Sequence, residues 1–193
     1  MSDIDLAALA ADVRYLKDRA GIIDALNRYT RGLDRLDRAL LISAYHPHAT
    51  DDRGNAYHPR GYSNPLGRES RVDWLIEAVG RFFHCSHHIS NFTIDIDGDA
   101  AHCEAYVITT QLAEEGDGKA TLGAARYMDR FERIDGLWAI AHREVNMDFQ
   151  VTVPINVMPP DVLPGMRDRT DRTYARPLAL SADAQERDRA TSA

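Results

Sequence analysis

Residues 101–153, AHCEAYVITTQLAEEGDGKATLGAARYMDRFERIDGLWAIAHREVNMDFQVTV, contain the pattern that decides the fold. The segment has long strand-like runs separated by two turn signals. One turn is the polar stretch 114–119 with its glycines, and the other is Asp135-Gly136, a dipeptide that favours the tight turn of a β-hairpin. The sequence therefore predicts a meander of antiparallel strands at residues 101–112, 120–133 and 137–153.

The same period of two extends upstream. Residues 87, 89 and 91 alternate with residues 88, 90 and 92, and Asp97-Gly98-Asp99 is a turn signal. A further strand is therefore expected directly before the meander.

Apolar residues recur at helical spacing in the first half of the chain. This spacing predicts helices over residues 6–20, 22–33, 38–45 and 71–83. Gly21 interrupts the first pattern, and His46-Pro47 ends the third, because the residue before proline disfavours the helical conformation. Residues 51–67 are rich in Gly, Pro, Asn and Asp and are predicted to form a loop. Helices followed by an antiparallel sheet are typical of an α+β domain, with helices on one face of a curved sheet and a cavity between them.

The composition and the pattern of the sequence change at Pro154. The stretch PINVMPPDVLPGM holds four prolines and no regular period, and Ser181 to Ala193 is charged and rich in small residues. We therefore expect an α+β domain over residues 1–153 and a C-terminal extension over 154–193. The extension is predicted to act as an arm or a lid with a flexible end.

Composition excludes several classes of protein. The 193 residues carry a formal net charge of −7, which argues against nucleic-acid binding and against attraction to anionic lipid. No apolar run approaches the roughly 20 residues of a membrane span, and the N-terminus is too polar for a signal peptide. With two cysteines, Cys85 and Cys103, no disulfide framework is indicated, so a cytoplasmic protein is expected.

The densest group of chemically active side chains is His84-Cys85-Ser86-His87-His88. Its spacing completes no zinc motif, and neighbouring strand residues face opposite ways, so His87 and His88 cannot bind one ion. We therefore predict no metal site.

Two charged residues elsewhere stand out. Asp34 lies at the edge of the apolar stripe of its helix, either as a solvated residue or as the partner of a nearby arginine. Arg143 shares a strand face with small apolar residues, which indicates a pocket, an interface or a plain surface position.

Taken in order, these signals resemble a known family. A helical Tyr-x4-Asp, His-His-Ile-Ser-Asn before Asp-Gly-Asp, and Asp-Gly-x-Trp leading to an arginine are similar to the SnoaL-like branch of the nuclear transport factor 2-like superfamily over residues 18–149. The branch includes scytalone dehydratase, hexachlorocyclohexane dehydrochlorinase and bile-acid 7α-dehydratase. The resemblance implies a cone-shaped α+β barrel around a deep pocket, a homotrimer, and catalysis without a metal or an organic cofactor.

The resemblance also implies a site. His87 matches the catalytic base of these enzymes, and Asp34 matches the carboxylate that pairs with it. Tyr29 and Arg143 match further catalytic residues, which would protonate a leaving group and stabilise negative charge. Substrate contacts are expected from Tyr45, Tyr57 and Asn91.

The function expected from this site is a lyase, specifically a dehydratase that performs β-elimination on a hydrophobic, ring-bearing steroid, polyketide or aromatic molecule. The same His/Asp pair would also serve double-bond isomerisation or the deformylating C–C cleavage of lignin-derived aromatics. A third alternative is a non-catalytic β-subunit of a ring-hydroxylating dioxygenase, in which both residues are structural. A small-molecule carrier is a further possibility.

Overall fold

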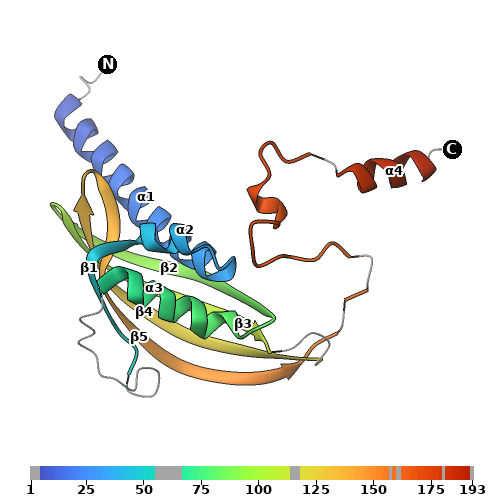
Figure 1. Ribbon diagram of the computed structural model, residues 1–193. Helices are drawn as coiled ribbons and strands as arrows, with labels where there is room; N and C mark the ends of the chain where they lie inside the picture. The colour runs from blue at the N-terminus through green and yellow to red at the C-terminus, as the bar shows by residue number, and fades with distance from the viewer. Residues whose placement is uncertain are drawn as a thin grey trace.

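The computed structural model describes residues 5–54, 67–113, 118–156, 158–159, 162–179 and 181–191. Helices α1 to α3 lie together against one side of a curved sheet (Figure 1). The helices of this layer are α1 (Leu6–Asp34), α2 (Arg38–Ala44) and α3 (Gly67–Gly80). The strands are β1 (Tyr45–Asp52), β2 (His84–Asp97), β3 (Ala100–Leu112), β4 (Lys119–Ile134) and β5 (Leu137–Pro154). The predicted α+β class is confirmed.

The sheet has the strand order β1-β5-β4-β3-β2 and is not closed into a complete barrel. Strands β2 to β5 form the predicted antiparallel meander. The β4–β5 hairpin turns at Asp135-Gly136, where both residues have positive φ (51° and 80°), as the two-residue turn requires. Register shifts at Ser90/Thr93, Ala124/Ala125 and Arg130/Phe131 bend the strands, since a bulge adds local twist.

Strand β1 was not predicted from the sequence. It pairs in parallel with β5 at the edge of the sheet, so the sheet is not purely antiparallel. Pro47 lies inside β1, within a register shift between Tyr45 and Thr50. Proline is tolerated there because an edge strand at an irregular position does not need every ladder hydrogen bond.

The prediction that Gly21 separates two helices was wrong, because α1 is continuous over 29 residues. Gly21 serves packing: a Cβ at this position would lie 2.8 Å from Cδ1 of Trp138 on β5. Trp138 also donates from Nε1 to Oδ1 of Asp18, 3.1 Å away, which fixes α1 across the sheet. Gly32 has the same purpose against α2, since its Cβ would meet the backbone of Leu41 at 2.8 Å.

Beyond β5 the chain leaves the sheet and returns toward the helices before ending in α4 (Figure 1). Its described elements are the short 3-10 helix η1 (Arg172–Tyr174) and α4 (Ala182–Thr191). Helix α4 was not predicted from the sequence, which indicated a flexible end. Ser181 begins α4 by accepting a hydrogen bond from the amide of Ala184 at 3.2 Å, and Ala, Gln and Glu in this segment favour helix.

None of the helices in the described ranges combines the length and the apolar character needed to cross a membrane.

Candidate active site

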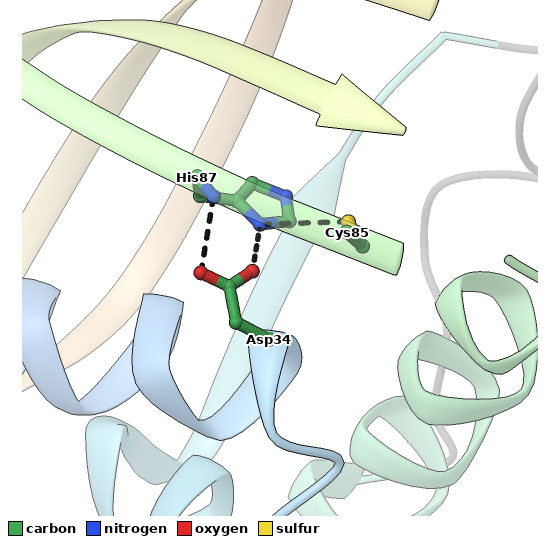
Figure 2. Close-up of side chains that lie close together, drawn as sticks. All are labelled: Asp34, Cys85 and His87. Atoms are coloured by element: carbon green, nitrogen blue, oxygen red, sulfur yellow. Dashed lines mark hydrogen bonds and ion pairs between the residues drawn. The ribbon is translucent and has the colours of Figure 1, made fainter. Parts of the chain in front are cut away.

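His87 and Asp34 form a directly hydrogen-bonded pair (Figure 2). Nδ1 of His87 lies 2.7 Å from Oδ1 of Asp34, and the backbone N–H of His87 donates to Oδ2 at 3.0 Å. Both side chains are largely buried, with exposed fractions of 7% for His87 and 12% for Asp34. Two bonds from one carboxylate fix both the position and the ring orientation of the histidine.

Local sequence patterns bring the two residues together. Asp34 is the last residue of α1, directly after an apolar stripe that packs against the sheet and includes Ile22, Leu26, Tyr29 and Leu33. His87 has the strand parity of Cys85, which is fully buried, so both point toward the helices. The end of the helix and the inner face of β2 therefore meet at this pair, where Asp34 accepts two hydrogen bonds from His87.

A cavity of about 270 Å³ adjoins the pair, between α3 and the inner face of the sheet. His87 is part of its wall, and Figure 2 shows Nε2 on the side of the ring that faces away from Asp34. Apolar side chains dominate the described wall, including Leu33, Trp74, Leu75 and Val145. The polar members include Arg53, Thr109, Gln111 and Tyr127. An apolar pocket with a few convergent polar groups is the usual form of a small-molecule site.

Asp34, Cys85 and His87 also form the one group of potential metal ligands found among the described residues, with donor atoms within 4.8 Å of one another. Most of these donor atoms are already hydrogen-bonded, because both oxygens of Asp34 and Nδ1 of His87 take part in the hydrogen bonds between the two residues. Burial raises the pKa of the Cys85 thiol to about 12, so it stays protonated and is a poor metal ligand. The arrangement fits an oriented histidine better than a metal centre.

Tyr29, Tyr45 and Arg143 do not lie in the cavity wall as the structure describes it. All are almost completely buried, and the Arg143 guanidinium lies between the rings of Tyr29 and Tyr127, 4.1 and 3.9 Å from their centroids. Arg143 also makes a two-bond ion pair with Asp129, at 2.7 and 2.6 Å. The catalytic roles predicted for Tyr29 and Arg143 and the substrate contact predicted for Tyr45 stay predictions, and in the structure these side chains lie behind the described wall, packed against and paired with their neighbours.

Two residues that the sequence analysis did not single out take their place in the wall. Tyr127 is the phenol that lines the cavity, and burial raises its pKa well above the usual value, so it stays protonated. Arg53 also lines the cavity; its Nε and Nη2 donate to Asp51 at 2.7 and 3.0 Å, and Nη2 also donates to the Tyr29 hydroxyl at 3.0 Å. Arg53 follows the missed strand β1, so no periodicity pointed to it.

The remaining predicted contacts are placed as follows. Asn91 is exposed at the bulge in β2, with φ of 53°, and is not part of the described cavity wall. Its backbone conformation, at the register shift between Ser90 and Thr93, is part of the bulge in β2. Tyr57 lies outside the residues that the structure describes.

Comparison with solved structures supports the fold. Hexachlorocyclohexane dehydrochlorinase LinA-type3 from Novosphingobium barchaimii is 22% identical, with 77% of this chain and 99% of that chain covered and a TM-score of 0.62. A candidate scytalone dehydratase from Novosphingobium aromaticivorans is 19% identical, with coverage of 80% and 99% and a TM-score of 0.62. An NTF2-like protein with a cystatin-like fold from the latter organism is 20% identical, with coverage of 76% and 92% and a TM-score of 0.63.

No curated protein sequence matches the chain. The SnoaL-like domain family does match it, over residues 14–144, which is more than half of its length. This segment contains most of α1, all of α2 and α3, most of the sheet and both members of the His87–Asp34 pair. Because the match covers more than half of the chain, the protein belongs to the SnoaL-like domain family.

Proposed function

We propose that this protein is a lyase, specifically a dehydratase that acts on a small ring-bearing molecule and needs no metal or organic cofactor. The observation that carries the proposal is the hydrogen bond between Asp34 and Nδ1 of His87 at the wall of an apolar cavity. The carboxylate fixes the tautomer in which Nδ1 carries the proton and Nε2 is free to accept one.

In the proposed reaction, Nε2 of His87 removes a proton from a carbon next to an activating carbonyl group. The electron pair of the broken C–H bond forms a carbon–carbon double bond, and the adjacent C–O bond breaks. The hydroxyl leaves as water after taking a proton. Asp34 stabilises the imidazolium that forms, as the carboxylate does in hydrolase triads. The step is neutral in redox terms, so it requires no electron acceptor.

Tyr127 is the proposed proton donor to the leaving hydroxyl. It is a protonated phenol in the cavity wall, and its ring makes an edge contact with Tyr29, at a centroid distance of 5.7 Å. Tyr29 and Arg143 hold Tyr127 in place from behind, through this edge contact and through the guanidinium over its ring. Thr109 is an alternative proton donor. It belongs to the cavity wall and lies directly opposite His87 in the pairing of β2 with β3.

The size of the cavity bears on the substrate. An apolar cavity of roughly 150 Å³ accommodates benzene. The cavity of about 270 Å³ therefore suits a molecule of one or two rings better than a steroid.

We also propose that the protein assembles as a homotrimer through the outer face of its sheet. Ile108, Ala124 and Phe149 are paired across β3, β4 and β5, and Tyr106 and Val151 extend this apolar row. Ile108 and Phe149 are 46% and 60% exposed in the single chain, which favours burial against a second copy. Native mass spectrometry tests this assembly: three copies per particle support it, and a monomer at micromolar concentration contradicts it.

A simple substrate tests the catalytic proposal. 3-Hydroxy-1-tetralone has two rings and an acidic C–H beside its ketone, and loss of water converts it into 1-naphthol, which absorbs in the ultraviolet. In D₂O, exchange of the acidic proton reports the base step separately from loss of the hydroxyl, by NMR. We expect the protein to accelerate both steps and His87→Gln to lower the rate about 100- to 10,000-fold.

His88→Gln is the matched control, because His88 is the neighbouring histidine on the exposed face of β2. Its activity should equal that of the unmodified protein. Exchange without naphthol would favour the isomerase alternative. Neither exchange nor naphthol formation above the rate of the His87→Gln variant would contradict the proposal.

A further inference from the structure

The cavity has an unusual charge distribution for an acidic protein. Its described wall contains two guanidinium groups, those of Arg53 and Arg81, and no carboxylate. The chain as a whole carries a net charge of −7. The excess of positive charge is therefore a local property of this wall and does not follow from the composition.

The charged groups around Arg53, behind this part of the wall, do not cancel its positive charge. Arg53, Arg71 and Arg143 surround the carboxylates of Asp51 and Asp129, so that three buried or half-buried cations face two anions. Burial would raise the pKa of Asp51, but the guanidiniums of Arg53, Arg71 and Arg143 lower it. This carboxylate is therefore ionised and is one of the two anions of the cluster. One positive charge of the cluster has no counterpart among the described residues, and an uncompensated charge in a desolvated site is costly.

Arg53 is the member of the cluster that reaches the cavity. Its side chain is 17% exposed, whereas those of Arg71 and Arg143 are 3% and 0% exposed, and only Arg53 of the three is part of the wall. The bonds to Asp51 and to the Tyr29 hydroxyl use Nε and Nη2, and within the described chain no hydrogen bond uses Nη1. Two N–H donors therefore remain on a guanidinium that is held rigidly by its other bonds.

We propose that the substrate carries an anionic oxygen, as a carboxylate or a phenolate, which binds Nη1 of Arg53 while the reacting carbon lies at His87. The inference rests on the proposed function because it takes this cavity as the substrate site. It adds the substrate class: a ring-bearing organic anion. Charge-assisted bonds of this kind are about twice as strong as neutral ones, so the ionised group should dominate affinity.

Binding measurements separate this inference from the chemistry. Calorimetry at pH 8 would compare 2-naphthoate, its neutral analogue 2-naphthamide, and 4-nitrophenolate, in the His87→Gln variant as well as in the unmodified protein. We expect naphthoate or nitrophenolate to bind at least 10-fold more tightly than naphthamide in both proteins. Which of the two anions binds more tightly distinguishes a carboxylate from a phenolate. Equal affinities for all three would overturn the inference, even if dehydration is observed.

Variants of the two wall arginines locate the effect. Arg53→Met should reduce the preference for the anion to less than threefold and leave the affinity for naphthamide unchanged. Arg81→Met is the matched control, since Arg81 is exposed and water screens its charge, and it should retain most of the preference. If Arg53→Met does not fold, Arg53→Lys retains the charge beside Asp51 and should keep a reduced preference. A full preference in the Met variant, or its loss only in Arg81→Met, would assign anion binding to another group.

Discussion

The Nε atom of Arg167 lies 3.2 Å from the main-chain oxygen of Asp34, so the C-terminal extension contacts the residue that orients His87. Nη1 of the same guanidinium donates to the carbonyl oxygens of Val79 and Phe82, at 2.9 and 2.6 Å. A single cation thus binds carbonyl oxygens at the end of α1 and at the end of α3, where positive charge is favourable. Because Val79 and Phe82 also belong to the cavity wall, the extension supports both the pair and the cavity.

Arg167→Met should therefore impair catalysis as well as stability. We expect kcat to fall about 10-fold with little change in KM, because the carboxylate of Asp34 loses its fixed position and the cavity remains. The free energy of unfolding should fall by about 1–3 kcal/mol, the usual effect of losing hydrogen bonds to a charged group. Steady-state kinetics and urea denaturation measure the two effects. Arg176→Met is the control, since among the described residues Arg176 bonds only the carbonyls of Thr173 and Ala175 in its own segment. Equal losses in both variants would mean that Arg167 has no special role.

Asp34→Asn tests the orienting carboxylate directly. The amide group can accept only one of the two hydrogen bonds that the carboxylate accepts from His87, and its NH₂ favours the wrong tautomer of the ring. Turnover should fall about 100- to 10,000-fold while the protein stays folded. Nitrogen chemical shifts of the imidazole should report the change of tautomer. Unimpaired turnover with an altered tautomer would show that the reaction does not require the hydrogen bond between His87 and Asp34.

Cys85 lies beside His87, with Sγ 3.9 Å from Nδ1, but it should take no part in the reaction. Burial raises the pKa of both Cys85 and Cys103 to about 12, so both thiols stay protonated at pH 8. The native protein should not react with a disulfide reagent within minutes, whereas the denatured protein should react at both cysteines. Cys85→Ser and prolonged dialysis against EDTA should leave the turnover unchanged. Loss of activity in the variant would indicate a role for the thiol, and loss after dialysis would indicate a role for a metal ion.

Arg143 and Asp129 should depend on each other for stability, so that loss of one residue is more destabilising than loss of both. Both side chains are fully buried, so Arg143→Met leaves an uncompensated carboxylate and should destabilise the protein by about 3–5 kcal/mol. The double variant Arg143→Met/Asp129→Leu should recover much of this loss, because two apolar side chains need no partner. Chemical denaturation of the singles and the double measures the coupling. Additive losses would show that the two charges do not depend on each other.

Asp171 should make docking of the extension sensitive to acid. Its carboxylate accepts from the backbone amides of Thr173 and Met166, each at 2.9 Å, and lies 3.4 Å from Nε of Arg35. These contacts lower the pKa of Asp171 to about 2, and the hydrogen bond with Thr173 has the largest effect. A group whose pKa is lower in the folded state stabilises that state above its unfolded pKa, near 3.9, and ceases to do so as the pH falls toward 2.

The unmodified protein should therefore have a higher Tm than Asp171→Asn above about pH 5, and the difference should disappear as the pH approaches 2. Thermal unfolding of both proteins across this range provides the comparison. A Tm difference that does not change with pH would mean that the hydrogen bonds matter and the charge does not.

Much of the fold could be predicted because the signals are local. The period of two and the Asp135-Gly136 turn predict the meander, and helical spacing predicts α1 to α3. Strand β1 could not be predicted, because it contains Pro47 and is held by pairing with β5 about ninety residues later. The continuity of α1 through Gly21 likewise depends on Trp138, whose ring occupies the space that a side chain would fill.

The sequence by itself determined the α+β class, the meander and, through the family resemblance, the pairing of His87 with Asp34, because periodicity, turn chemistry and motif order are written along the chain. Only the tertiary structure decided which side chains face the cavity. It moved Tyr29 and Arg143 behind the wall and brought Tyr127 and Arg53 into it. Whether an inward-facing side chain reaches the cavity or is covered depends on its neighbours across the sheet and helices, and these contacts join residues far apart in sequence.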